Sequence, residues 1–259
     1  MSAAHTRMPV LFLGHGSPMN AIEDNDLSRD LAAMAGGLPT PEAVLVVSAH
    51  WMTPGSTRVL SSAWPRTIHD FYGFPRELYQ IEYPAPGSPA LAAETARLTG
   101  AVQDDAWGLD HASWAVLRHV FPAADVPVYE LSLDMSAPPS AHVELGGRLA
   151  PLRDRGVLVV GSGNLVHNLG AVRWAEDAEP YDWALEFDGW VASRLRDGDV
   201  DGLTSYAELG RVADAACPTA DHYLPVLYAA AMAGPDDPVT FFHEGIDLGS
   251  VSMRCVRWG

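Results

Sequence analysis

Three runs of apolar residues, each followed by a histidine, recur along this chain. They are residues 9–13 with His15, residues 43–48 with His50, and residues 157–160 with His167. Because the runs are apolar at consecutive rather than alternate positions, they predict strands that are covered on both faces, as in a parallel sheet. Ligands of open α/β sheets bind beyond the carboxyl ends of such strands. We therefore expect the three histidines to converge on one rim of a sheet.

Helix and strand signals alternate along the rest of the chain. Helices are expected at 27–35, 88–98, 112–120, 140–155, 181–196, 203–215 and 221–232, and further strands at 127–133, 239–242 and 250–256. The last two strands are expected to pair antiparallel at a sheet edge. The pattern predicts an α/β fold with a largely parallel central sheet, flanking helices and antiparallel edge strands. We expect residues 1–7 to be a flexible tail and residues 8–259 a single catalytic domain.

Composition narrows the class of protein. The apolar runs are shorter than the roughly 20 residues of a membrane span, and the first residues lack a signal-peptide core. With only two cysteines, Cys217 and Cys255, we expect neither a disulfide framework nor a thiolate zinc site. These features predict a cytoplasmic protein with no membrane partner. A net charge of −17 argues against a nucleic-acid partner. The chain has no lysine, which excludes Schiff-base chemistry and a P-loop.

The strand-end histidines are candidate metal ligands. Neutral imidazole is a common ligand for iron and zinc, and rigid strands hold ligand geometry well. His222 joins them because it lies at the expected start of an apolar helix, where a charged imidazolium is disfavoured. It is either a further ligand or a helix-start histidine that only meets solvent.

Other polar residues near these segments have a structural and a functional interpretation. His111 could be held in one tautomer by Asp110, or could simply begin a helix without a partner. Asn164, with Gly161 and Gly163, suits a tight turn that brings backbone close to a bound group, or an ordinary strand-to-loop turn. We assign structural or surface roles to His5, His119, His142 and His243, and expect that replacing His142 changes nothing.

Six motifs in order then resemble the class III extradiol ring-cleavage dioxygenases, most closely the single-chain 4,5-DOPA extradiol dioxygenase branch. They are Gly14-His-Gly-Ser-Pro-Met-Asn20, Ser48-Ala-His-Trp51, Thr67-Ile-His-Asp-Phe71, Tyr83-Pro-Ala-Pro-Gly-Ser-Pro89, Gly163-Asn-Leu-Val-His-Asn168 and Asp221-His-Tyr-Leu-Pro225. The resemblance runs from about Met8 to the segment around residue 253, nearly the whole chain.

The resemblance implies a mononuclear non-haem metal site that inserts O2 into a catechol, possible substrates including DOPA. It implies Fe(II) for activity, with Zn(II) also able to occupy the site. His15, His50 and His222 would hold the metal, although two histidines and one carboxylate are usual in the wider class. His167 would act as acid–base or as a fourth ligand, and His111 would contact the substrate.

From the same motifs we expect His69, Asn164 and Tyr223 to bind the substrate. The same histidines would also suit a zinc-dependent hydrolase that activates water, which is the alternative function. A purely structural metal is the third interpretation. The sequence leaves the oligomeric state open.

Overall fold

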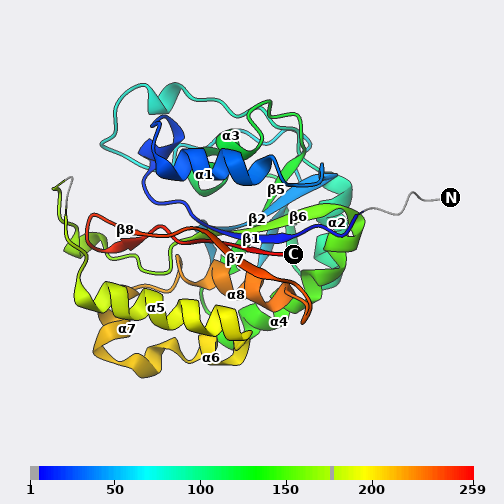
Figure 1. Cartoon of the computed structure of the whole chain (residues 1–259). Coiled ribbons are helices and arrows are strands. Elements are labelled where there is room, and N and C mark those ends of the chain that lie inside the picture. The colour runs from blue at the N-terminus through cyan, green and yellow to red at the C-terminus, as the bar shows by residue number, and fades with distance from the viewer. Residues whose placement is uncertain (1–5, 176–177) are drawn as a thin grey trace.

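Three buried parallel strands form the centre of the sheet. In the computed structural model, which describes residues 6–175 and 178–259, β1 (Val10–Gly14) pairs with β6 (Val157–Gly163), and β6 pairs with β2 (Ala43–Thr53). Every residue of β1 and β6 is buried. The continuous apolar runs therefore predicted these strands correctly, because helices cover both faces (Figure 1).

The complete sheet has eight strands in the order β4-β3-β5-β2-β6-β1-β10-β7. The strands outside the centre are β3 (Arg58–Leu60), β4 (Val102–Asp104), β5 (Val128–Asp134), β7 (Val239–His243) and β10 (Cys255–Trp258). β5 is parallel to β2, whereas β10 and β7 form an antiparallel edge beside β1. The expected parallel sheet with antiparallel edge strands is confirmed.

The strand expected at 250–256 is wrong as a single element. The chain forms β9 (Val251–Ser252), which pairs with β8 (Ile246–Asp247) in a small separate sheet, and only then enters β10. Arg254 lies between the two strands, where its guanidinium is buried in an ion pair with Asp188. This ion pair connects the segment between β9 and β10 to the helical layer.

Helices form a layer on each face. They are α1 (Asp26–Ala35), α2 (Pro89–Thr99), α3 (His111–Val120), α4 (Pro139–Leu149), α5 (Asp182–Asp197), α6 (Val200–Thr204), α7 (Arg211–Ala216) and α8 (Leu224–Met232). Figure 1 shows α1 and α3 on one face and α4 to α8 on the other. One contiguous apolar core runs through both layers. No helix among the described residues is both long and apolar enough to cross a membrane.

Three helix predictions need correction. The helix expected at 140–155 ends at Leu149 and continues as a 3-10 turn, because Pro151 cannot donate a helical hydrogen bond. The helix expected at 203–215 is broken by Gly210, whose φ of 56° lies in the left-handed region. The helix expected from Asp221 begins at Leu224, so His222 precedes it.

Most of the expected N-terminal tail lies outside the described residues, as does His5. Of its remaining two residues, Arg7 lies 3.8 Å from Asp154 and 4.0 Å from Asp237.

Two glycines of β6 let the segment before α8 lie directly on the sheet. A Cβ atom on Gly163 would lie 2.1 Å from the carbonyl oxygen of His222, and one on Gly161 would lie 2.4 Å from that of Pro225. The sequence suggested a turn that approaches a bound group. Instead both residues are within the strand, and the backbone that approaches is the protein's own.

We expect Gly163→Ala to lower the free energy of unfolding by about 1–3 kcal/mol, because the new methyl group displaces the backbone of His222. Gly147→Ala is the matched control. That glycine is exposed on α4 with no atom within 4 Å of its Cβ position, so alanine there should stabilise by up to about 1 kcal/mol. Urea unfolding measures both variants, and equal stability of Gly163→Ala and the wild type would contradict the close approach.

Candidate metal centre

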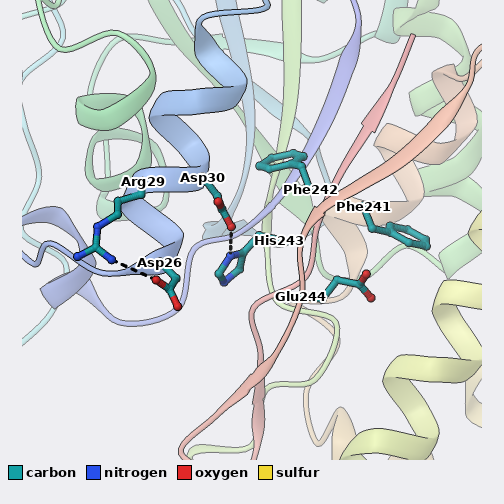
Figure 2. A pocket seen from close by; sticks show the side chains of 7 residues that line it. All are labelled: Asp26, Arg29, Asp30, Phe241, Phe242, His243 and Glu244. Atoms are coloured by element: carbon teal, nitrogen blue, oxygen red, sulfur yellow. Dashed lines mark hydrogen bonds and ion pairs between the residues drawn. The ribbon is translucent and has the colours of Figure 1, made fainter.

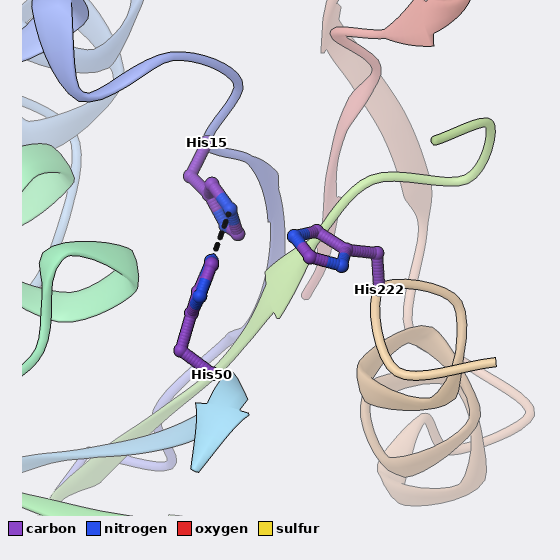
Figure 3. Close-up of side chains that lie close together, drawn as sticks. All are labelled: His15, His50 and His222. Atoms are coloured by element: carbon purple, nitrogen blue, oxygen red, sulfur yellow. Dashed lines mark hydrogen bonds between the residues drawn. The ribbon is translucent and has the colours of Figure 1, made fainter. Parts of the chain in front are cut away.

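Three histidines from distant parts of the chain meet at the carboxyl end of the central strands. His15 follows β1, His50 comes from β2, and His222 precedes α8 (Figure 3). One ring nitrogen from each lies within 4.8 Å of the other two. His15 and His222 are almost fully buried, whereas the side chain of His50 is 21% exposed. The cluster is therefore open to solvent at His50.

The sequence suggested that His50 follows the end of a strand, but it lies within β2. β2 continues to Thr53, while its pairing with β6 ends at Ser48 and its register with β5 shifts between Val47 and Met52. This irregularity frees the His50 side chain from the regular sheet and directs it towards His15, as Figure 3 shows.

Hydrogen bonds fix the tautomer of His15. Its Nδ1 atom lies 3.1 Å from Oγ of Ser162, and that hydroxyl donates its only hydrogen to the carbonyl oxygen of Ala112 at 2.6 Å. Ser162 can therefore only accept from the ring, and Nδ1 of His15 carries the proton. The lone pair of His15 is consequently on Nε2.

Carboxylates lie beside Nδ1 of the other two rings. Nδ1 of His222 makes a short contact with Oδ2 of Asp221, and Nδ1 of His50 lies 3.2 Å from Oδ2 of Asp70. An ionised carboxylate only accepts hydrogen bonds, so His222 carries its proton on Nδ1. The contact between Oδ2 of Asp70 and His50 lacks hydrogen-bond geometry, and that oxygen has no hydrogen-bond partner among the described residues. Carboxylates in this position are typical of histidines that bind metals.

The resulting donor set fits a divalent metal. Nε2 of His15 and Nε2 of His50 face each other at 3.2 Å, a hydrogen-bond distance, so both nitrogens point at one position. Burial, followed by repulsion from neighbouring histidines, holds the pKa of both rings well below the usual value, so both are neutral. Neutral imidazoles with converging lone pairs are what metal binding requires.

His111 lies beside the three histidines, with its ring centroid 4.0 Å from that of His50. Its carboxylate partner is Asp70, whose Oδ1 atom lies 2.9 Å from the ring Nδ1. The sequence-based expectation that Asp110 is this partner is wrong. Asp110 instead accepts a hydrogen bond from the backbone of Ala112 as the N-cap of α3.

Asp110 supports the backbone segments that carry His50 and His111. It accepts a hydrogen bond from Ser48 Oγ at 2.7 Å, and this hydroxyl in turn accepts one from the backbone N–H of His50 at 3.1 Å. Burial, and then the nearby Asp70, raises the pKa of Asp110 to about 6. Asp110 thus links the strand that carries His50 to the helix that begins at His111.

His167 stacks on His222, with ring centroids 3.5 Å apart and planes 10° apart. It shares a donor group with Asp221 and His222 but not with His15 and His50. Because β6 extends to Gly163, only residues 164–166 separate the strand from His167, and its backbone N–H donates to Ala216. His167 is therefore held close to the end of the strand. Burial, and then His222, lowers the pKa of His167 to about 3.

The three residues expected to bind the substrate have different surroundings. Nε2 of His69 donates to the carbonyl oxygen of Ile81 at 3.0 Å, and its ring contacts Phe71, which in turn contacts the ring of His111. Asn164 is buried and donates to Ser252 O at 2.8 Å. Its backbone N–H donates to the carbonyl of His222, while its Oδ1 atom has no hydrogen-bond partner in the described part of the chain.

Tyr223 has no free hydroxyl to offer a substrate. The side chain is fully buried, and its hydroxyl donates to the carbonyl oxygen of Leu203 at 2.9 Å. Its ring packs against Phe187 and Tyr206 in the helical layer. The structure therefore contradicts the expectation that Tyr223 contacts the substrate.

His142 belongs to the core rather than to the surface. It is fully buried on α4, and its Nδ1 atom lies 3.0 Å from the hydroxyl of Tyr228 on α8. Its structural role matches the sequence interpretation. Because alanine would leave a cavity and an unpartnered tyrosine hydroxyl, the replacement should lower stability.

Two surface hollows lie elsewhere, and neither is lined by His15, His50 or His222. One of them, of about 450 Å³, is lined by residues of α1 and by residues 241–244 at the end of β7 (Figure 2). His243 forms an ion pair with Asp30 there. The position of the candidate site therefore follows from converging donor atoms rather than from the size of a hollow.

Comparisons with known proteins agree with this chemistry. The sequence pattern of a family described as the catalytic LigB subunit of aromatic ring-opening dioxygenase matches residues 8–251. A protein of Escherichia coli (strain K12) named 4,5-DOPA dioxygenase extradiol is 47% identical, over 98% of this chain and 96% of its own. A protein of the same name from Beta vulgaris is 36% identical, over 96% of each chain.

A solved structure shows the same fold. The crystal structure of an uncharacterized protein from Escherichia coli K12 has a TM-score of 0.85 and 41% sequence identity, and the match covers 98% of this chain and 100% of the other. The family match favours ring opening over the zinc-hydrolase alternative.

Without metal, the protein should lose stability as the pH falls below about 6.5. The histidines become protonated in the unfolded chain at this pH, whereas the buried histidines of the folded state stay neutral. His15, His50 and His167 all have lowered pKa values, and each should remove up to about 1.4 kcal/mol of unfolding free energy per pH unit in this range. The raised pKa values of Asp110, about 6, and of Glu130 offset part of this loss, because the folded state binds protons there that the unfolded chain does not.

Urea unfolding of metal-free protein between pH 7 and pH 5.5 measures this slope. His167→Asn should reduce the dependence of the unfolding free energy on pH by up to about 1.4 kcal/mol per pH unit, since asparagine does not titrate. An equal slope in the wild type and in His167→Asn would contradict the neutral, buried state of His167.

Proposed function

Because the chain belongs to the LigB family of aromatic ring-opening dioxygenases, we propose that it opens a DOPA-like catechol with O2 at a single metal ion. His15, His50 and His222 are the proposed ligands. The observation that carries this assignment is the convergence of their ring nitrogens, with the Nε2 atoms of His15 and His50 3.2 Å apart. The names of the two relatives support DOPA or a similar catechol as substrate.

Fe(II) is the metal proposed for activity, and Zn(II) suits the same three nitrogens. A divalent metal at this position supplies a Lewis acid that lowers the pKa of catechol hydroxyls and a place where catechol and O2 meet. Since all three ligands are neutral, they leave the full positive charge of the metal to attract a catecholate anion. The open side at His50 gives the substrate access.

Two further histidines are proposed to handle protons. His111 keeps its Nδ1 proton on Asp70, which leaves Nε2 able to accept a proton from a catechol hydroxyl. His167 is neutral, because burial lowers its pKa, and stacks on the proposed ligand His222. This stacking, and the absence of His167 from the donor group of His15 and His50, support an acid–base role over that of a fourth ligand.

Phe71 is proposed to form one wall of the catechol site. Its ring meets that of His111 edge to face at a centroid distance of 5.6 Å. An aromatic wall beside the base suits a planar substrate ring. The ring of His69 contacts that of Phe71 at a centroid distance of 5.9 Å, and His69 is proposed to act by supporting this wall.

Fe(II)-loaded protein should consume one O2 per catechol and form a yellow product, because a ring-opened conjugated semialdehyde absorbs visible light. An oxygen electrode and an absorption spectrum measure both, with His243→Gln as an active control outside the donor groups. Absence of oxygen uptake across a panel of catechols, together with hydrolysis of ester or phosphate substrates, would favour the zinc hydrolase instead.

His167→Gln should keep the metal and still bind catechol anaerobically, while turnover falls by roughly 10²–10⁴, because glutamine has a similar reach but exchanges no proton. His15→Ala is the contrasting variant and should lose the metal. Elemental analysis and anaerobic catechol titration are measured beside the rate. Loss of metal from His167→Gln would make His167 a ligand first.

A further inference from the structure

We propose that Asp70 is a positioning residue that fixes the protons of two histidines at once, one a ligand and the other a base; the inference rests on the function proposed above. Asp70 lies in the loop between β3 and α2, and its side chain is 14% exposed. Its Oδ1 atom accepts from both the backbone N–H of His111, at 3.0 Å, and the ring Nδ1, at 2.9 Å. Its Oδ2 atom lies 3.2 Å from Nδ1 of His50 and has no hydrogen-bond partner among the described residues, so it can accept the Nδ1 proton of that ring.

The loop that carries Asp70 is fixed to the segment before α3. Ile68 and Leu109 are joined by a backbone hydrogen bond of 2.7 Å, and the indole of Trp114 donates to the carbonyl of Ile68 at 2.8 Å. Gly108 makes this close pairing possible, since a Cβ atom there would lie 2.3 Å from the carbonyl oxygen of Arg66. Asp70 is therefore presented to both histidines by a rigid connection rather than by a free loop.

Positioning explains these contacts better than metal ligation by Asp70. His50, Asp70 and His111 form a possible donor group of their own. However, Oδ1 of Asp70 already accepts two hydrogen bonds, and Oδ2 faces the side of the His50 ring opposite to the nitrogen that meets His15. A carboxylate that only accepts can hold both Nδ1 protons, which turns both Nε2 lone pairs outward.

Asparagine at this position tests the idea because it has the shape of aspartate but only one acceptor oxygen. If that oxygen stays on His111, the amide N–H2 group faces Nδ1 of His50. The ring must then accept at Nδ1 and carry its proton on Nε2, the atom that faces His15 at 3.2 Å. Asp70→Asn should therefore close the proposed metal position by a change of tautomer.

Asp221→Asn is the matched control for loss of one negative charge. Asp221 meets a single histidine ring, that of His222, through Oδ2. Asparagine there can keep its oxygen on this ring, so the tautomer of His222 is preserved. The comparison between the two variants separates the tautomer effect from the effect of charge.

The test measures ring tautomers and metal affinity without catechol or O2. Long-range ¹H–¹⁵N NMR spectra of metal-free protein should show His50 and His111 protonated on Nδ1 in the wild type, and His50 protonated on Nε2 in Asp70→Asn. Zn(II) affinity, measured by competition with a chelator, should fall about 10–100-fold in Asp70→Asn and at most a few-fold in Asp221→Asn.

A wild-type spectrum with His50 protonated on Nε2 would overturn the proposal even if Asp70→Asn failed to fold. Reduced Zn(II) affinity with an unchanged His50 tautomer would also overturn it and make Asp70 a ligand. Unchanged affinity and tautomer would do the same. If tautomers and affinity follow the expectation but no catechol is opened, the proposed function fails while the role of Asp70 stands.

Discussion

The candidate site depends on where each histidine carries its proton. Ser162 and Asp221 take the Nδ1 protons of His15 and His222, and Asp70 is proposed to take that of His50. With all three protons on Nδ1, the Nε2 lone pairs of His15 and His50 face each other and repel unless a cation lies near both. Burial strengthens the constraint, because it disfavours the charged rings that could otherwise occupy the site.

The fold supplies this arrangement through close contacts between segments that are far apart in the sequence. His222 can reach the end of β6 because Gly163 leaves room for its carbonyl group, and the backbone N–H of Asn164 then donates to that carbonyl at 2.9 Å. Asp110 connects the strand of His50 to the helix of His111 through hydrogen bonds with Ser48 and Ala112. These contacts fix the backbone that carries the histidines. The histidines are therefore brought together by the fold before any metal binds.

Much of the fold could be predicted from the sequence because its signals are local. Continuous apolar runs identified the central strands, and their carboxyl ends placed His15 and His50 near each other. Helix ends were less predictable at Pro151 and Gly210, where one residue interrupts an otherwise helical pattern. The break between β9 and β10 was hidden because it follows from the contact of Arg254 with a distant helix.

The partners of the site could not be predicted in the same way. Asp70 is next to His69 in the sequence, yet it binds His111 and lies against His50, and only the folded loop brings them together. For the same reason Asp110, adjacent to His111, was assigned the wrong role. Tyr223 followed His222 in a matching motif, but adjacent residues before a helix point in different directions, and its hydroxyl is bound to Leu203.

The central claim is that three Nε2 atoms form one metal position, and a crystal structure of the Zn(II)-loaded protein with anomalous diffraction at the zinc edge tests it most directly. The account predicts one strong peak about 2.0–2.1 Å from Nε2 of His15, His50 and His222, with Asp70 still at Nδ1 of His50. A peak bound by the Asp70 carboxylate, or one that lacks any of these three nitrogens, would contradict it.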